Sequence, residues 1–137
     1  MGSTPQAALS AHTENLIWGL AKNYHDNKRS CGGSSGGDAG MVAARCVPLG
    51  VGTDLGSSIR IPATFNGIVG FKPTQRRFTN RGAFDGRKIR FVPGNASFPA
   101  TMGPLAHSAR DCIEFFKVMC NDKQYLVDPF MAPTSFD

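Results

Sequence analysis

The sequence predicts an α/β protein. Segments with helical and strand-like patterns alternate along the chain, in the order helix, strand, helix, strand and a late helix. The chain has 137 residues, of which 41% are hydrophobic and 18% charged, a composition typical of a folded domain rather than a disordered chain. Two short strands make a poor sheet by themselves, so we expect the domain to be incomplete.

The first half of the chain contains four predicted elements. Residues 14–19 predict a short helix that Gly19 ends. Helix-forming residues at 38–46 predict a second helix, and the apolar residues 47–53 predict a buried strand. Serines that can cap a helix open the segment 57–65, which predicts a third helix.

The second half contains the clearest helix. Residues 68–71 predict a second buried strand, whereas residues 75–99 look irregular. Ser108 is a good N-cap with Asp111 three residues later, and apolar residues then recur at helical spacing. These signals predict an amphipathic helix over about residues 108–120.

Positive charge is concentrated in one segment. The net charge is +5, and seven basic residues lie between Lys72 and Arg90, opposed only by Asp85. A basic run with interleaved phenylalanines can contact nucleic acid or an anionic membrane surface. No nucleic-acid motif accompanies this run, so we favour a solvated loop and expect no nucleic-acid partner.

The cysteines and the start of the chain bear on cofactors and location. The four cysteines lack the spacing of a zinc site, so we expect free buried thiols and no metal or other cofactor. The first residues do not resemble a signal peptide, and no stretch is long enough to cross a bilayer. We expect a cytoplasmic or peripherally membrane-associated protein, and the sequence leaves membrane association and the oligomeric state open.

Glycine is concentrated between Gly32 and Gly70, which hold ten of the sixteen glycines. Such a surplus indicates positive φ angles or close backbone approach, so we expect function in this region. The string GGSSGG at residues 32–37 lacks the lysine of a P-loop. It also does not follow an apolar strand, as the glycine-rich loop of a dinucleotide-binding fold would.

The same string matches the nucleophile elbow G-x-S-x-G of α/β-hydrolases, centred on Ser34 or Ser35. That elbow requires a buried strand just before it, but residues 28–31 are polar. It also requires a downstream histidine, and His107 is the one available. We therefore disfavour the elbow, and a plain Gly/Ser linker remains the structural alternative.

A second special segment, GTDLGSSIR at residues 52–60, lies between a predicted strand and a predicted helix. Backbone amides at the start of a helix are unpaired donors, so they can hold an oxyanion while a serine attacks a carbonyl. That serine needs a base. Two serine-rich turns, at Ser34 and Ser58, suggest that one serine relays a proton to the other.

Taken together, GGSSGGDAG and PLGVGTDLGSSIRIPATFNGIVGFKPT resemble the amidase signature family of serine hydrolases. The resemblance extends from TPQAALSAHTENLIWG to LVDP, and it is strongest to the fatty acid amide hydrolase and acetamidase branch. It implies a portion of an α/β/α layered fold with a mixed sheet, incomplete at both ends. Residues 1–137 would then form a single partial domain whose catalytic core spans residues 31–74.

The resemblance also implies roles for individual residues. Ser58 matches the acylating nucleophile, and Ser34 matches a serine that follows a cis peptide bond and relays the proton. The family's oxyanion hole is matched here by the backbone amides of Leu55, Gly56, Ser57 and Ser58. Supporting positions of the family are matched by Thr53, Asp54 and Arg60. We expect Asp54 and Arg60 to hold the turn rather than to take part in the chemistry. The implied reaction is hydrolysis of a small-molecule linear amide or ester, including fatty acyl amides.

Two departures from the family pattern favour an alternative. The family's base is a lysine upstream of the first segment present here, and Lys22, Lys28 and Lys72 occupy no matching position. Ser57 stands where the family usually has glycine, and a side chain strains a positive φ. We therefore expect this chain alone to be inactive. The alternative is a catalytically inactive truncated paralogue or fragment that acts, if at all, as a binding module.

Overall fold

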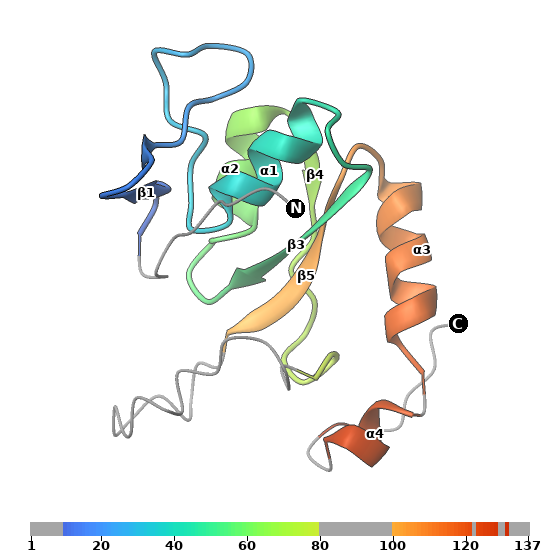
Figure 1. Cartoon of the computed structure of the whole chain (residues 1–137). Coiled ribbons are helices and arrows are strands. Elements are labelled where there is room, and N and C mark those ends of the chain that lie inside the picture. The colour runs from blue at the N-terminus through green and yellow to red at the C-terminus, as the bar shows by residue number, and fades with distance from the viewer. Residues whose placement is uncertain (1–9, 80–99, 122, 129–130, 132–137) are drawn as a thin grey trace.

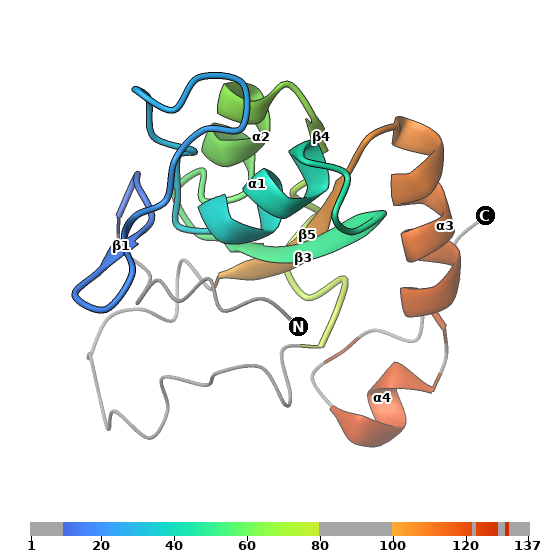
Figure 2. The same cartoon turned by 45° about the horizontal axis from the view of Figure 1, so that its top comes forward.

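The computed structural model describes residues 10–79, 100–121, 123–128 and 131. A three-stranded sheet with the strand order β3-β5-β4 forms its middle. These strands are Leu49–Asp54 (β3), Val69–Gly70 (β4) and Thr101–Ala106 (β5). Helices α1 (Gly36–Ala43) and α2 (Arg60–Asn66) lie together beside the sheet, and α3 (Ala109–Met119) lies apart from them, next to β5 (Figures 1 and 2).

Strand β5 is the central strand of the sheet. Strand β3 pairs with β5 along its whole length, from Leu49 opposite Ala106 to Asp54 opposite Thr101. Strand β4 pairs with the other edge of β5. The α/β class is confirmed, but the described strands pair only antiparallel, so the mixed sheet implied by the resemblance is not seen in this part of the fold.

Small apolar residues pack α1 and α2 against the sheet. Ala39 and Val42 of α1 meet Ile59, Ala63 of α2 and Leu105 of β5 in one buried cluster. All five side chains are at most 4% exposed. Burial of such side chains is the main stabilising term in a fold of this size. This cluster fixes the helices that follow the two serine-rich turns.

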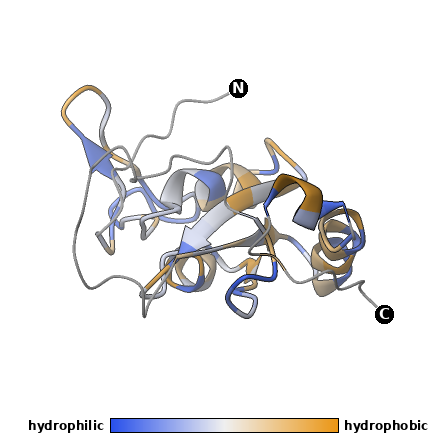
Figure 3. Ribbon diagram, turned by 90° about the horizontal axis from the view of Figure 1, so that it is seen from below, coloured by the Kyte–Doolittle hydropathy of each residue, from blue (hydrophilic) through white to orange (hydrophobic). Residues whose placement is uncertain are grey.

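A second cluster forms under α3. Phe116 of α3 packs with Phe78 and Cys120, and its ring stands edge-on to that of Phe71 with the centroids 5.1 Å apart. The opposite side of α3 is polar, so the helix is amphipathic as predicted (Figure 3). The predicted helix over about residues 108–120 is confirmed with one residue's difference at each end.

The N-terminus of α3 carries a complete capping box. The Ser108 hydroxyl accepts a hydrogen bond from the Asp111 amide at 3.2 Å, and the Asp111 carboxylate accepts one from the Ser108 amide at 3.1 Å. Ser108→Ala removes one of these bonds, so we expect the free energy of unfolding to fall by about 1 kcal/mol. Chemical denaturation measures this change, and an unchanged midpoint would contradict the role of the cap.

The prediction of a helix over residues 14–19 is wrong. Strands β1 (Glu14–Asn15) and β2 (Gly19–Leu20) form a hairpin instead. The Asn15 side chain accepts hydrogen bonds from the amides of Ile17 and Trp18 at 3.0 and 2.8 Å, and Gly19 adopts a φ of +69°. An Asn side chain that binds its own following backbone favours a tight turn over a helix.

Other predicted elements are confirmed with shifted ends, and two elements were missed. The segments 38–46, 47–53, 57–65 and 68–71 correspond to α1, β3, α2 and β4. Strand β5 was not predicted, because Pro104 and Gly103 are poor strand residues. The short helix α4 (Gln124–Val127) was also missed. The irregular segment predicted at 75–99 falls largely on residues 80–99, which lie outside the described residues.

All four cysteines are free, as predicted. Cys31, Cys112 and Cys120 are buried, but Cys46 is exposed because it follows the end of α1 in the loop before β3. The prediction that all four are buried is therefore wrong at Cys46. Among the described helices, none has both the length and the apolar character needed to cross a membrane.

Candidate active site

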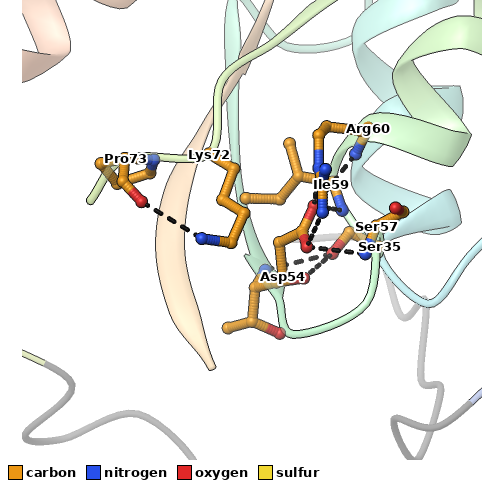
Figure 4. Close-up of polar contacts among 8 residues, drawn as sticks. Ser35, Asp54, Ser57, Ile59, Arg60, Lys72 and Pro73 are labelled. Atoms are coloured by element: carbon orange, nitrogen blue, oxygen red, sulfur yellow. Dashed lines mark hydrogen bonds and ion pairs between the residues drawn. The ribbon is translucent and has the colours of Figure 1, made fainter. Parts of the chain in front are cut away.

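Asp54 organises the turn that carries Ser58. Its carboxylate is fully buried at the end of β3 and accepts hydrogen bonds from the amides of Ser57 at 2.7 Å and Ile59 at 3.1 Å. The Arg60 guanidinium donates two more, at 3.0 and 2.9 Å (Figure 4). One carboxylate thus ties together the residues on both sides of Ser58.

These contacts keep Asp54 ionised. Burial alone raises the pKa of its carboxyl, but the bonds from Arg60 and from the amides of Ser57 and Ile59 outweigh that effect and lower the pKa to about 2. The same ion pair raises the pKa of Arg60. Asp54 is therefore a fixed anchor of the turn rather than a group that exchanges protons near neutral pH.

Ser57 occupies a backbone conformation that favours glycine. Its φ is +89°, as the comparison with the family pattern led us to expect. In this conformation, the Cβ of an L-residue costs about 1–2 kcal/mol of folding free energy. Glycine avoids this cost, but part of the gain is offset because glycine has more conformational freedom to lose on folding.

Ser57→Gly is therefore expected to raise the free energy of unfolding by up to about 1 kcal/mol. Ser57→Ala is the matched control, since it removes the hydroxyl but keeps the Cβ, and it should give no such gain. Chemical denaturation of the three proteins measures both changes. A glycine variant no more stable than the alanine variant would contradict the strain.

The first serine turn lies just before α1. The peptide bond between Gly33 and Ser34 is cis, which agrees with the conformation expected from the resemblance. Ser35 follows as the N-cap of α1, and Ser34 itself is half-buried. The helix thus begins at Gly36, two residues after Ser34.

Ser35 joins the two serine turns. Its amide donates to the carbonyl oxygen of Ser58 at 3.1 Å. Its hydroxyl contacts both the amide and the carbonyl of Thr53, at 3.2 and 3.3 Å. A Cβ on Gly52 would lie 2.6 Å from the Ser35 hydroxyl oxygen, so glycine at this position permits the close approach. Ser34 and Ser58 are therefore held on neighbouring segments.

The predicted oxyanion-hole amides divide into two groups. Within the described residues, the amides of Leu55, Gly56 and Ser58 donate no hydrogen bond. The Ser57 amide, in contrast, already donates to Asp54. Three of the four predicted donors are available at the turn, and the fourth is committed to holding it.

The three histidines have contacts of other kinds. His12 lies 3.3 Å from the Glu14 carboxylate, and His25 contacts the carbonyl oxygen of Asn66. His107 lines a shallow pocket of about 230 Å³ between the ends of α1 and α2. A nucleophile elbow needs a strand just before its serine. In the described chain, the segment before Ser34 has instead a single β-bridge between Lys22 and Ser30.

Lys72 contacts the residue that follows it in the chain. It is half-buried, and its Nζ donates to the carbonyl oxygen of the adjacent Pro73 at 3.4 Å (Figure 4). Neither Lys22 nor Lys28 lies in the serine turns. Within the described residues, no lysine side chain is hydrogen-bonded to Ser34 or Ser58.

One residue of the site was missed by sequence reasoning. Thr13 is 2% exposed, and its hydroxyl contacts the turn that carries Ser34. It lies about twenty positions upstream, at the edge of the segment predicted to be a helix. A hairpin signal at Asn15 would have placed this threonine beside the turn, but a single threonine carries no pattern of its own.

The chain is similar to known proteins along almost its whole length. A family model described as Amidase matches residues 1–135. Fatty acid amide hydrolase 1 of Caenorhabditis elegans is 35% identical over 137 residues, covering 98% of this chain and 23% of that protein. The acetamidase of Aspergillus oryzae is 35% identical over 131 residues, covering 96% of this chain and 23% of that protein.

A solved structure gives the same result. The structure titled fatty acid amide hydrolase superposes with a TM-score of 0.87 and 33% identity, covering 98% of this chain and 23% of the other. The chain therefore spans about a quarter of the length of the relatives it matches.

Proposed function

Because the chain belongs to the amidase signature family, we propose that it supplies the nucleophile, the proton relay and the oxyanion site of a serine hydrolase that cleaves small-molecule amides. The observation that carries the proposal is the turn from Asp54 to Arg60. A buried carboxylate holds its backbone in place, and within the described residues the amides of Leu55, Gly56 and Ser58 donate no hydrogen bond. Such preorganised donors stabilise the charge that develops in acyl transfer.

The chemistry begins at Ser58. Its Oγ attacks the amide carbonyl carbon, and the proton of its hydroxyl passes to Ser34. The carbonyl oxygen becomes an oxyanion, which the amides of Leu55, Gly56 and Ser58 stabilise. We leave Ser57 out of this set because its amide already donates to Asp54. Each such donor contributes about 10²- to 10³-fold to the rate in a comparable hydrolase.

The second half of the reaction releases the amine. The bond between the carbonyl carbon and the nitrogen breaks, and Ser34 donates a proton to the leaving nitrogen. Water then attacks the acyl-enzyme, and Ser58 recovers its proton as the acid leaves. The link from the Ser35 amide to the Ser58 carbonyl supports this relay, since it fixes the two turns against each other. The ultimate base is the lysine that the family supplies.

The competing function is a catalytically inactive relative that acts as a binding module. The positive φ at Ser57 favours it, because a side chain there is strained beside the nucleophile. The retained Ser34, Ser58, Asp54 and Arg60 favour an active hydrolase. A single assay separates the two functions.

That assay places this chain in a complete domain. The segment of the Caenorhabditis elegans relative that matches this chain is replaced by residues 1–135, and the chimera is assayed on short and fatty acyl amides. We expect the chimera to hydrolyse amides and the 137-residue chain alone to be inactive. A folded chimera without activity, beside an active parent relative, would favour the binding module. Hydrolysis by the chain alone would contradict the need for the lysine.

A further inference from the structure

Thr13 lies against the turn that carries Ser34. Its side chain is buried at the edge of the β1–β2 hairpin, and its hydroxyl oxygen lies 3.0 Å from the carbonyl oxygen of Gly32 and 3.3 Å from that of Ser34. The same hydroxyl accepts a hydrogen bond from the Gly36 amide at 3.0 Å. One side chain thus binds the backbone before, at and after the two serines.

This contact replaces the usual cap of α1. Gly36 is the first residue of the helix, and its amide is one of the donors that a helix leaves unpaired. The N-cap residue Ser35 makes no side-chain capping bond, because its hydroxyl contacts Thr53 instead. The cap therefore comes from Thr13, twenty-three positions upstream, and it frees Ser35 to join the two serine turns.

The position of Thr13 is itself fixed. Its carbonyl oxygen accepts a hydrogen bond from the Ala21 amide at 2.8 Å, which ties it to the residue that follows β2. A Cβ on Gly36 would collide with the Thr13 hydroxyl and would lie 2.6 Å from the sulfur of Cys31. The hydroxyl therefore sits in a closely packed site with little freedom to move.

We propose that Thr13 is a positioning residue that orients Ser34 for proton transfer to the leaving amine. The proposal rests on the proposed function, since it assigns the orientation of the residue that acts as relay there. A hydroxyl has a single proton, so Thr13 accepts from Gly36 and donates to the Gly32 and Ser34 carbonyls in turn. Valine has nearly the same shape but makes none of these bonds.

The test uses the chimera described above and two substrates with the same acyl group, an anilide and a p-nitrophenyl ester. An amine must gain a proton as it leaves, whereas p-nitrophenolate leaves without one. Thr13→Val is expected to lower kcat on the anilide about 10- to 100-fold and kcat on the ester by less than about threefold. KM should stay within about twofold, because Thr13 touches no substrate in the proposed mechanism.

Three further variants complete the test. Thr13→Ser keeps the hydroxyl and should restore both rates to within about threefold of the parent chimera. Thr13→Cys offers a weaker donor and should give an intermediate amide-to-ester ratio. Thr101→Val is the matched control, since Thr101 is 3% exposed and its hydroxyl has no partner within the described residues. It should leave the ratio unchanged.

The amide-to-ester ratio does not depend on how much of the enzyme is folded. A purely structural role for Thr13 would lower both rates by the same factor, and that result would overturn the proposal. So would a valine variant with the ratio of the parent, or a serine variant that fails to restore it. If Thr13→Val does not fold, the ratios of the serine and cysteine variants decide. A parent chimera without activity would instead contradict the proposed function.

Discussion

Asp54→Asn is expected to lower the free energy of unfolding by about 3 kcal/mol, the largest stability loss that we predict for a single residue. The carboxylate is fully buried and accepts bonds from two charged donors of Arg60 and from the amides of Ser57 and Ile59. An asparagine carries no charge and can accept at only one of its two side-chain atoms. The hydrogen bonds at the other atom are lost, because that atom becomes an NH2 donor that faces other donors.

Asp26→Asn is the matched control. Asp26 also accepts from an arginine, Arg29, at 3.0 Å and from the amide of Lys28 at 2.9 Å. Its side chain is 42% exposed, so this variant should cost less than about 0.5 kcal/mol. Urea denaturation measures both variants. Equal losses at the two positions would show that the burial and the hydrogen bonds of Asp54 do not matter.

The pH dependence of stability follows from the same carboxyl. Its pKa is lowered from 3.8 to about 2 in the folded chain, so the unfolded state binds the proton more readily. The stabilisation is therefore fully present above the unfolded value and is lost as the pH falls from about 5 to about 2. The stabilisation is on the order of 2 kcal/mol. Asp54→Asn should remove this part of the acid sensitivity, and an unchanged acid profile would contradict it.

Ser58→Ala is expected to have the largest effect on activity. In the chimera it should lower kcat/KM on amides at least about 10³-fold, because the attacking oxygen is gone while the oxyanion donors remain. Stability should change little, since only the carbonyl of Ser58, and not its side chain, contacts Ser35. Steady-state kinetics and denaturation measure the two effects.

Ser108→Ala is the control for Ser58→Ala. It also removes a serine hydroxyl, but the contacts of that hydroxyl are with Asp111 at the start of α3. Amide hydrolysis by the Ser108 variant should stay within about threefold of the parent. A Ser58 variant that retained comparable activity would remove Ser58 from the role of nucleophile.

Local signals in the sequence were sufficient for several features. Ser108 and Asp111 predicted the capped helix α3, because a capping box depends on residues three positions apart. The glycine surplus predicted the turns around Ser34 and Ser58, and the structure has the cis peptide bond and the positive φ of Ser57 at those turns. Such features depend on residues that are close together in the chain, so a single sequence is enough to predict them.

Features that depend on distant contacts were not predictable in the same way. Strand β5 contains Gly103 and Pro104, and its pairing with β3 across about fifty residues decides its conformation. The segment at Asn15 forms a hairpin instead of the predicted helix, because side-chain bonds to the following amides outweigh weak helix propensity. The commitment of the Ser57 amide to Asp54 likewise appears only once the turn is folded.

Covalent labelling identifies the residue that attacks the substrate, which we propose to be Ser58. The chimera and its Ser58→Ala variant are treated with a fluorophosphonate probe, digested and examined by mass spectrometry. We expect one adduct, on the peptide that contains Ser58, and its disappearance in the variant. An adduct on another residue would contradict the role of Ser58 as nucleophile. So would labelling that persists in the Ser58→Ala variant of a chimera that hydrolyses amides.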